Sequence, residues 1–395
     1  NGTIFTYEKE GVIPGLLTRW YTERKSIQKQ AKESYGTDMY EYYDKRQLVR
    51  KILLNSAYGA LLNEHCRFYD KRIGQSVTLS GRQIVKHMMS QINQTVTGEY
   101  THEGDAIVYG DTDSCYFTAF TTMKKQIESG ELEWNKETCI GLYDAIADEA
   151  NNSFPAFMEK AFHSPRKNGE IIKAGRELIG DRSIFITKKR YAINIYDKEG
   201  KRKDSGNSLG DIKAMGLDLK RSDTPKVCQE FLSDVLTDVL TGSDEQSVQT
   251  KVLAFRKEFR SWPGWLKGSP KRANKITHYQ NVMESNKKAT IPGHVLASIN
   301  WNRLKRIYND NYSMPIQDGF KVVVCKLRPN PSGMTSVAYP VDELTLPQWF
   351  KELPFDDEAM EAALIDKKIE NLLGVLDWKS LSEQDANNFT DLFSF

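Results

Sequence analysis

Two stretches with helical periodicity, separated by a short polar segment, constrain the fold of the first sixty residues. Each stretch carries an apolar stripe, made of Leu16, Leu17, Trp20 and Tyr21 in the first and of Leu48, Val49, Ile52, Leu53 and Ala60 in the second. Between them, residues 33–44 are polar, rich in Tyr and contain a glycine, which is typical of the tip of a helical hairpin. The pattern predicts a helical hairpin from Val12 to about Asn63.

Further along the chain, short apolar runs at 106–109 and 114–118 flank the sequence Gly-Asp-Thr-Asp. This arrangement predicts a β-hairpin with an acidic turn. Periodicity also predicts a helix over 80–95, strands at 183–186, 191–196 and 321–326, and mostly helices between 225 and the last strand. We therefore expect an α+β fold.

The overall composition excludes several classes of protein. The 395 residues include 55 Lys and Arg against 53 Asp and Glu, so the chain is neither a polyionic disordered tail nor a histone-like polycation. Five cysteines without a CxxC pair argue against a disulfide framework or a zinc ribbon and favour a reducing cytoplasm. No apolar run approaches the roughly 18 residues of a membrane span, and we expect no membrane partner.

The small net charge conceals two oppositely charged blocks. Residues 251–330, the basic block, hold 16 Lys and Arg against 4 Asp and Glu, a net charge of +12. Residues 352–395, the acidic block, hold 3 against 11, a net charge of −8. The basic block is a candidate surface for a polyanion, or alternatively a solvated face without a ligand.

The segment KILLNSAYG places three different polar groups on one helix face. Lys51, Asn55 and Tyr58 are spaced i, i+4 and i+7, and Gly59 follows them. A cation, an amide and a phenol in this order suit the triphosphate, the base pair and the sugar of one nucleotide, and a glycine permits close approach. The alternative is an amphipathic helix with a solvated polar face.

The segment VYGDTDSCYF places Asp111 and Asp113 at the tip of the predicted β-hairpin. Carboxylates this close repel each other, and a hard divalent cation such as Mg²⁺ removes the repulsion through oxygen ligands. Asp-Thr-Asp is also ordinary turn chemistry, so a plain β-turn is the alternative.

Taken together, KxxxNSxYG followed 60 residues later by YGDTDS resembles motifs B and C of the family B DNA polymerases. GVIPGLLTRWYTERK is similar to the start of the family's fingers helix, FITKKRYAINIYD to its KKRY strand, and IKAMGLDLKRSDTPK to its palm-to-thumb junction. The terminal FTDLFSF resembles the clamp-binding tail of T-even-like bacteriophage replicative polymerases.

The resemblance implies the hand-like α+β fold of this family. Helical-hairpin fingers would span 12–62 and an antiparallel-sheet palm 63–214, with residues 1–11 as the end of an earlier palm segment. A largely helical thumb would span 215–395 and end in a clamp-binding tail, 388–395. The expected function is DNA-directed DNA polymerase.

The resemblance also implies roles for the nucleotide-binding residues. Arg24 and Lys51 would grip the phosphates of the incoming dNTP, and Lys51 would also serve catalysis. The family's second cation, four residues after the arginine, corresponds to Gln28, with Lys29 next to it as the alternative phosphate ligand. Asn55 and Tyr58 would lie against the nascent base pair.

The resemblance implies a pair of Mg²⁺ ions as the cofactor, with Mn²⁺ as a substitute. Asp113 would be the direct ligand, Asp111 a weaker one, and Glu177 in GRELIG would hold an outlying ion. The implied contacts to primer–template DNA come from five residues: Lys188, Lys189, Arg190, Tyr191 and Gly59.

Motif A of the family, DxxSLYPS, does not occur in this sequence, and neither do the acidic motifs of the proofreading exonuclease. We therefore expect the C-terminal polypeptide of a split, cleaved or truncated phage replicase in the host cytoplasm, inactive without an N-terminal part that carries both. The alternative is a non-catalytic DNA-binding remnant. A sliding clamp is the expected partner of the tail residues Phe389, Leu392, Phe393 and Phe395, unless the tail folds back on the thumb.

Overall fold

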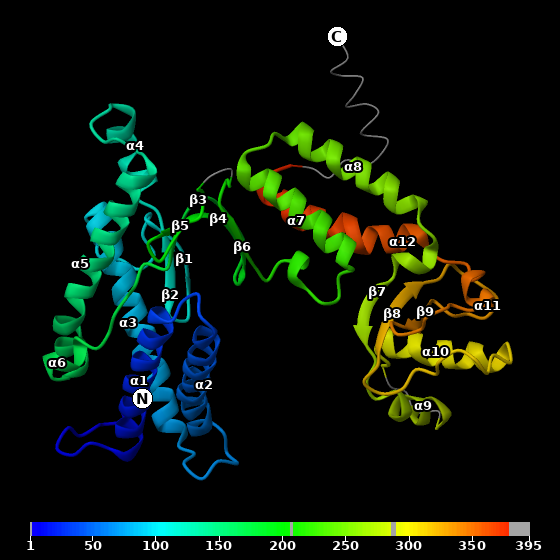
Figure 1. The fold of residues 1–395 in the computed structure, drawn as a ribbon, viewed down its shortest axis with the longest axis horizontal. Helices are drawn as coiled ribbons and strands as arrows, with labels where there is room; N and C mark the ends of the chain where they lie inside the picture. The colour runs from blue at the N-terminus through cyan, green and yellow to red at the C-terminus, as the bar shows by residue number, and fades with distance from the viewer. Residues whose placement is uncertain (1, 206–207, 286–289, 379–395) are drawn as a thin grey trace. The chain divides into compact units, whose positions relative to one another are not determined.

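The computed structural model describes residues 2–205, 208–285 and 290–378 (Figure 1). The chain divides into two compact units, Asn1–Gly175 and Arg176–Phe395, which are described separately. Helices dominate both units, and the described residues form antiparallel sheets of two, four and three strands. The mixture of helices and antiparallel sheets confirms the α+β prediction.

The first unit begins with the predicted helical hairpin, formed by α1 (Val12–Glu33) and α2 (Asp38–Leu61). The tip is shorter than the predicted 33–44, because α2 already begins at Asp38, where the acidic residues of the first turn favour a helix N-terminus. The two helices are joined by an ion pair between Glu23 Oε2 and Arg50, 2.6 Å long.

The apolar stripe predicted for α2 is wrong as a description of its packed face. Val49 and Ile52 are 56% and 55% exposed, and Leu48 is exposed as well. Polar side chains face α1 in their place, and their hydrogen bonds and ion pair satisfy them there. Gln47, for example, accepts a hydrogen bond from Arg24 of α1.

The rest of the first unit surrounds the β-hairpin with helices. Its elements are α3 (Lys71–Thr97), β1 (Ile107–Asp111), β2 (Ser114–Phe117), α4 (Phe120–Glu128), α5 (Lys136–Phe162) and α6 (Arg166–Gly169). The helix predicted at 80–95 is longer because the side chain of Asp70 caps its start and Gly98, with a φ of 87°, ends it. Met88, Ile92 and Phe154 belong to the core that joins α3 to α5.

The second unit begins with a four-stranded antiparallel sheet. Its strands are β3 (Leu178–Thr187), β4 (Arg190–Lys198), β5 (Lys201–Arg202) and β6 (Asp211–Met215), and β4 pairs with the other three. The short helix η1 (Asp218–Lys220) leads to α7 (Lys226–Thr241) and α8 (Glu245–Ser261). The predicted strands at 183–186 and 191–196 are confirmed as parts of β3 and β4.

The remaining elements complete one core of this unit and form a second. They are η2 (Gly264–Lys267), β7 (Ser269–Arg272), α9 (Ile276–Glu284), α10 (Gly293–Ile307), β8 (Lys321–Lys326), β9 (Ser336–Pro340), α11 (Gln348–Lys351), α12 (Asp357–Glu361), η3 (Ala362–Asp366), α13 (Lys367–Leu373) and η4 (Gly374–Leu376). Strand β8 confirms the predicted strand at 321–326. Strand β7 was not predicted, because Ser-Pro-Lys-Arg is polar and contains a proline, which an edge strand tolerates.

No helix within the described ranges is long and apolar enough to cross a membrane.

Candidate active site and DNA-contact elements

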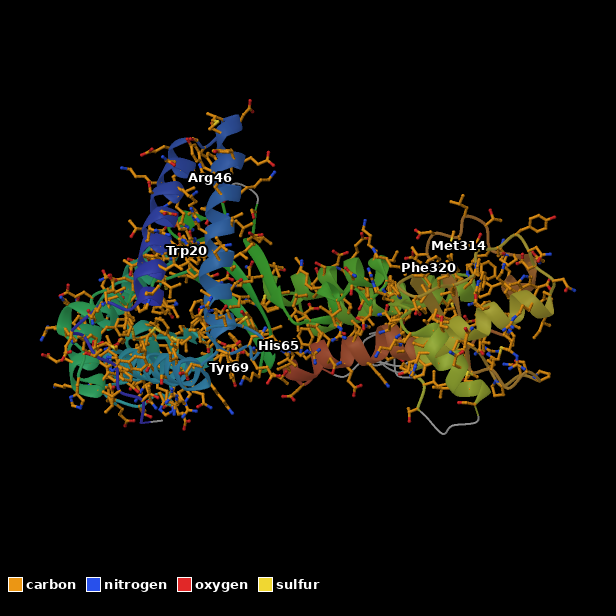
Figure 2. The ribbon with its side chains drawn as sticks, turned by 90° about the horizontal axis from the view of Figure 1, so that it is seen from below. Trp20, Arg46, His65, Tyr69, Met314 and Phe320 are labelled. Carbon is orange, nitrogen blue, oxygen red and sulfur yellow. The ribbon has the colours of Figure 1, made fainter. Side chains whose placement is uncertain are left out.

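The two cations predicted to bind phosphate, Arg24 and Lys51, lie on the two helices of the α1–α2 hairpin. Arg24 Nε donates to Gln47 Oε1 at 3.3 Å, and Gln47 in turn donates to Asp44 Oδ1 at 3.0 Å. Gln47 lies one helical turn before Lys51, so the guanidinium of Arg24 is held one turn away from the exposed Lys51. Figure 2 shows this hairpin, with Trp20 on α1 and Arg46 on α2 labelled.

The structure distinguishes the two candidates for the next position on α1. Gln28 is four residues after Arg24 and half-buried, so it lies on the same helix face. Lys29 is exposed, and its ammonium is 3.9 Å from Glu33 Oε1 on the outer side of the helix. Lys29 is therefore turned away from the face that carries Arg24.

Tyr58 is tied to a residue that the sequence did not suggest. Its hydroxyl makes a short hydrogen bond with the hydroxyl of Thr78 on α3 and a longer one, 3.5 Å, with the carbonyl of Gly74. The nearby Asn55 is exposed, and a Cβ added at Gly59 would meet no atom within 4 Å. The helix face at Asn55 and Gly59 is thus open to solvent, while the hydrogen bonds to Thr78 and Gly74 orient the Tyr58 ring.

The β1–β2 hairpin brings Asp111 and Asp113 together at its tip. Asp111 is paired with Ser114, and the intervening Thr112 adopts the left-handed region with a φ of 53°. The Thr112 hydroxyl donates to Asp111 Oδ1 at 3.1 Å, and the backbone N–H of Asp113 donates to the carbonyl of Asp111 at 2.6 Å. Asp111 is half-buried, whereas Asp113 is exposed at the apex.

The hairpin has the chemistry of a partial site for a hard cation. Two carboxylates on one tight turn match the oxygen ligands that Mg²⁺ prefers. Burial raises the pKa of the neighbouring Cys115 thiol to about 12. In the described part of the chain, no group of three or more His, Cys, Asp and Glu residues could hold a metal, so further oxygen ligands would have to complete the set.

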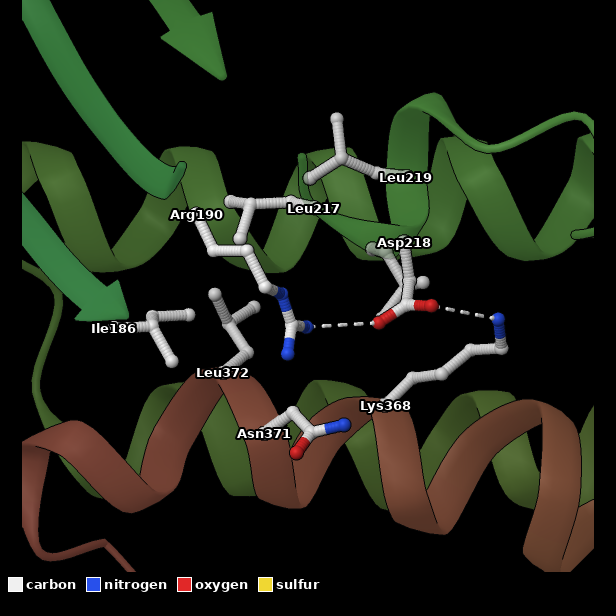
Figure 3. A pocket seen from close by; sticks show the side chains of 9 residues that line it. Ile186, Arg190, Leu217, Asp218, Leu219, Lys368, Asn371 and Leu372 are labelled. Carbon is white, nitrogen blue, oxygen red and sulfur yellow. Dashed lines mark hydrogen bonds and ion pairs between the residues drawn. The ribbon is translucent and has the colours of Figure 1, made fainter. Parts of the chain in front are cut away.

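The predicted DNA contacts of the second unit gather at the β3–β4 turn. Lys188 and Lys189 are exposed, and Lys189 has a left-handed φ of 63°. Arg190 donates to Asp218 Oδ2 at 3.2 Å (Figure 3). Tyr191 is only 9% exposed and stacks on Phe185, with ring centroids 5.5 Å apart, so its ring supports the turn from the interior.

Glu177, predicted to hold an outlying metal ion, lies just before β3. One of its oxygens is 3.0 Å from the ammonium of Lys213 on β6. A metal at Glu177 would therefore have to compete with this ion pair. The predicted clamp-binding residues Phe389, Leu392, Phe393 and Phe395 lie outside the described residues.

Part of the basic block serves internal contacts with the acidic block. Lys267 is 2% exposed and its ammonium lies 3.0 Å from Asp357 Oδ1. Arg260 makes a two-pronged contact with Glu361, at 2.7 and 2.8 Å. The charge of the block therefore overstates its surface available to a polyanion, an effect that charge counting could not reveal.

Other cations of the block remain at the surface. Arg272 on β7 is directly opposite Lys321 on β8, and both are exposed. Neither forms an ion pair with a carboxylate among the residues that the structure describes. Like charges opposite each other destabilise a sheet, and a bound polyanion would relieve this repulsion.

Comparison with known proteins agrees with these features. Residues 3–138 match the model of the DNA polymerase family B. The chain is 31% identical over 307 residues to the DNA-directed DNA polymerase of Enterobacteria phage T4, and 32% identical over 308 residues to that of Escherichia phage RB69. Each of these alignments covers 74% of this chain and 33% of the relative.

A similarity also extends to an archaeal protein. DNA polymerase 1 of Pyrococcus abyssi is 29% identical over 249 residues, which covers 63% of this chain and 26% of the relative. The chain thus spans about one third of the length of the phage relatives that it matches. The chain is therefore similar to the family B DNA polymerases, and to the T4-like phage type over 74% of its length.

Proposed function

We propose that this chain contributes the nucleotide-binding, primer-positioning and motif C parts of a DNA-directed DNA polymerase. The observation that carries the proposal is the hydrogen bond from Arg24 to Gln47, which lies one helical turn before the exposed Lys51 and beside the open face at Asn55. Two adjacent cations suit a triphosphate, and an open face next to them leaves room for a base pair.

In this proposal different residues of the first unit contact the dNTP, the nascent base pair and the metal. Lys51 and Arg24 hold the phosphates of the dNTP, while Asn55 and Tyr58 lie against the nascent base pair and Gly59 admits the DNA. Asp113, with Asp111 as a weaker partner, binds the divalent metal. Two Mg²⁺ ions, or Mn²⁺ in their place, would lower the pKa of the primer hydroxyl and offset the charge that develops on the phosphate.

The second unit supplies the grip on primer–template DNA. The exposed cations of the β3–β4 turn and the pair Arg272 and Lys321 would contact phosphates. In terms of the hand, we assign 12–62 to the fingers, 1–11 and 63–214 to the palm, and 215–395 to the thumb. Because DxxSLYPS does not occur in the sequence, synthesis would require a segment that carries this motif, whether joined to the chain or separate.

Reconstitution tests the proposal. The purified 395-residue chain is mixed with a polypeptide that carries motif A and the exonuclease, and extension of a labelled primer is followed with and without Mg²⁺. We expect metal-dependent extension from the mixture and none from either part. Extension by the chain alone, free of contaminating polymerase, or no extension from a correctly assembled mixture, would contradict the proposal.

The clamp proposal has its own test. Phe389, Leu392, Phe393 and Phe395 put four large apolar groups into seven residues at one end of the printed sequence, a composition suited to a groove on a partner. In the reconstituted enzyme, deletion of residues 389–395 should leave short, distributive primer extension unchanged and abolish the stimulation of this extension by the sliding clamp. Equal stimulation with and without these residues would refute the clamp role.

A further inference from the structure

The exposed turn between β3 and β4 is braced by the segment that follows β6. Gly216, with a φ of 63°, packs against the turn so closely that a Cβ would lie 2.1 Å from the carbonyl oxygen of Lys189. Two residues later, Asp218 accepts the hydrogen bond from Arg190. The same short segment therefore contacts both the backbone and a side chain of the turn region.

Asp218 is itself held in place from several sides. Its neighbours in sequence, Leu217 and Leu219, are buried in the core beneath the sheet. On its other side, Lys368 of α13 donates to Asp218 Oδ1 at 3.2 Å and to the hydroxyl of Thr224 at 2.8 Å. Figure 3 shows Arg190 and Lys368 reaching the two oxygens of this one carboxylate.

Burial distinguishes the roles of these charges. The side chain of Lys368 is 11% exposed and that of Asp218 20% exposed, so neither is well placed to meet a phosphate. Lys188 and Lys189, by contrast, are exposed at the tip of the turn. The inner charges can therefore fix the shape of the turn, while the outer charges face solvent.

We propose that Asp218 is a positioning residue for DNA binding. It links the side chain of Arg190, at the start of β4, to Lys368 of α13, so that the neighbouring Lys188 and Lys189 meet backbone phosphates in a fixed geometry. The inference rests on the proposed function, since it assumes that the turn contacts duplex DNA. Preorganisation of this kind lowers the entropy lost when long lysine side chains become ordered on a ligand. Asp218 thus strengthens DNA binding although its charge repels the phosphates.

The sign of this effect separates positioning from simple electrostatics. Replacement of Asp218 by Asn removes one negative charge near the turn, and Coulomb attraction alone would then make DNA bind more tightly. Loss of positioning has the opposite effect, because Arg190 and the turn lose their anchor. If Asp218→Asn binds DNA more weakly although its charge is more positive, positioning explains the result and Coulomb attraction does not.

The test measures binding of a fluorescein-labelled primer–template duplex to the full chain by anisotropy at several salt concentrations. We expect Asp218→Asn to weaken binding about 3- to 10-fold and to reduce the slope of log K against log [salt] by about 1. Asp218→Glu, which keeps the charge, should recover part of the loss. The matched control is Asp234→Asn, which makes the same charge change at an exposed position of α7 and should bind at least as tightly as the original chain.

A second arm separates positioning from general damage to the fold. In a Lys188→Gln/Lys189→Gln background, Asp218→Asn should cause no further loss of binding, because its effect passes through the turn. An equal loss in both backgrounds, or tighter binding by Asp218→Asn in the original chain, would overturn the inference and leave the proposed function standing. If the original chain itself shows no salt-dependent binding of duplex, the proposed function and the inference both fail.

Discussion

The hydroxyl of Tyr58 on α2 is hydrogen-bonded to the hydroxyl of Thr78 on α3, twenty residues further along the chain. This bond joins the helical hairpin to the helix that carries much of the first unit's core. It fixes the direction of the phenol ring at the position proposed to lie against the nascent base pair. A ring held in one orientation is a better test of base-pair shape than one that rotates freely.

Removal of the Thr78 hydroxyl should therefore lower fidelity. We expect Thr78→Val, in the reconstituted enzyme, to raise the ratio of incorrect to correct insertion about fivefold, since a net hydrogen bond is worth about 1 kcal/mol. Thr78→Ser keeps the hydroxyl and should behave like the original. Single-nucleotide insertion kinetics measure the ratio of incorrect to correct insertion in both variants. An unchanged ratio in Thr78→Val would show that the hydrogen bond does not control the orientation of the Tyr58 ring.

Lys51 and Lys29 should differ sharply in their effect on nucleotide use. Lys51→Ala removes a charge-assisted contact to phosphate and should lower kcat/KM for dNTP roughly 30-fold, or about 2 kcal/mol. Lys29→Ala should have little effect, because its ammonium lies beside Glu33 on the outer side of α1. Equal effects of the two substitutions in steady-state kinetics would contradict the assignment.

The cations of the basic block should separate into structural and DNA-binding groups. Asp357→Asn leaves the ammonium of Lys267 buried without its carboxylate, so we expect it to lower the free energy of unfolding by about 2 kcal/mol with little change in DNA binding. Arg272→Gln should instead weaken duplex binding and slightly raise the free energy of unfolding, because it removes the repulsion by Lys321 on the opposite strand. Urea unfolding and anisotropy titrations, carried out on both variants, measure the two properties, and the reverse pattern would refute the division.

His87 should make the first unit sensitive to acid. Its ring nitrogens contact Tyr100 and Ser153 at 2.7 and 2.8 Å, and burial lowers its pKa below the usual value of about 6.5. The unfolded chain then binds the extra proton more readily, so stability is fully present above about pH 6.5 and falls as the pH drops from there toward the lowered pKa.

The measurement for His87 compares variants. Urea unfolding of the original chain and of His87→Gln, at pH 7.5 and 5.5, should show a smaller pH dependence in the variant. Because burial also lowers the pKa of His294 in the second unit, His294→Gln is the matched control for effects outside the first unit. An identical pH dependence in the original and in His87→Gln would exclude His87 as the sensitive group.

The sequence predicted the features whose causes are local. Periodicity located α1, α2 and the strand at Lys321–Lys326, and the sequence Gly-Asp-Thr-Asp located the β1–β2 turn. It did not predict β7, because a polar edge strand has no alternating pattern and forms only when β8 is available for pairing.

Features that depend on distant residues were not predictable in this way. The partner of Tyr58 lies on another helix, so no spacing rule identifies Thr78. Likewise, charge counting gave the basic block its sign but could not show that Lys267 is paired with Asp357, ninety residues away. Such contacts are decided by tertiary packing, and only the structure reveals them.

The central claim is that Asp113 acts on catalysis through a bound metal and not through DNA. Its most direct test is single-turnover incorporation by the reconstituted enzyme carrying Asp113→Asn, with Asp105→Asn as the control at another exposed aspartate of the same unit. We predict that the Asp113→Asn enzyme incorporates no nucleotide, while its affinity for primer–template stays within about twofold of the original. The Asp105→Asn enzyme should match the original in both incorporation and affinity. Normal incorporation by Asp113→Asn would contradict the account.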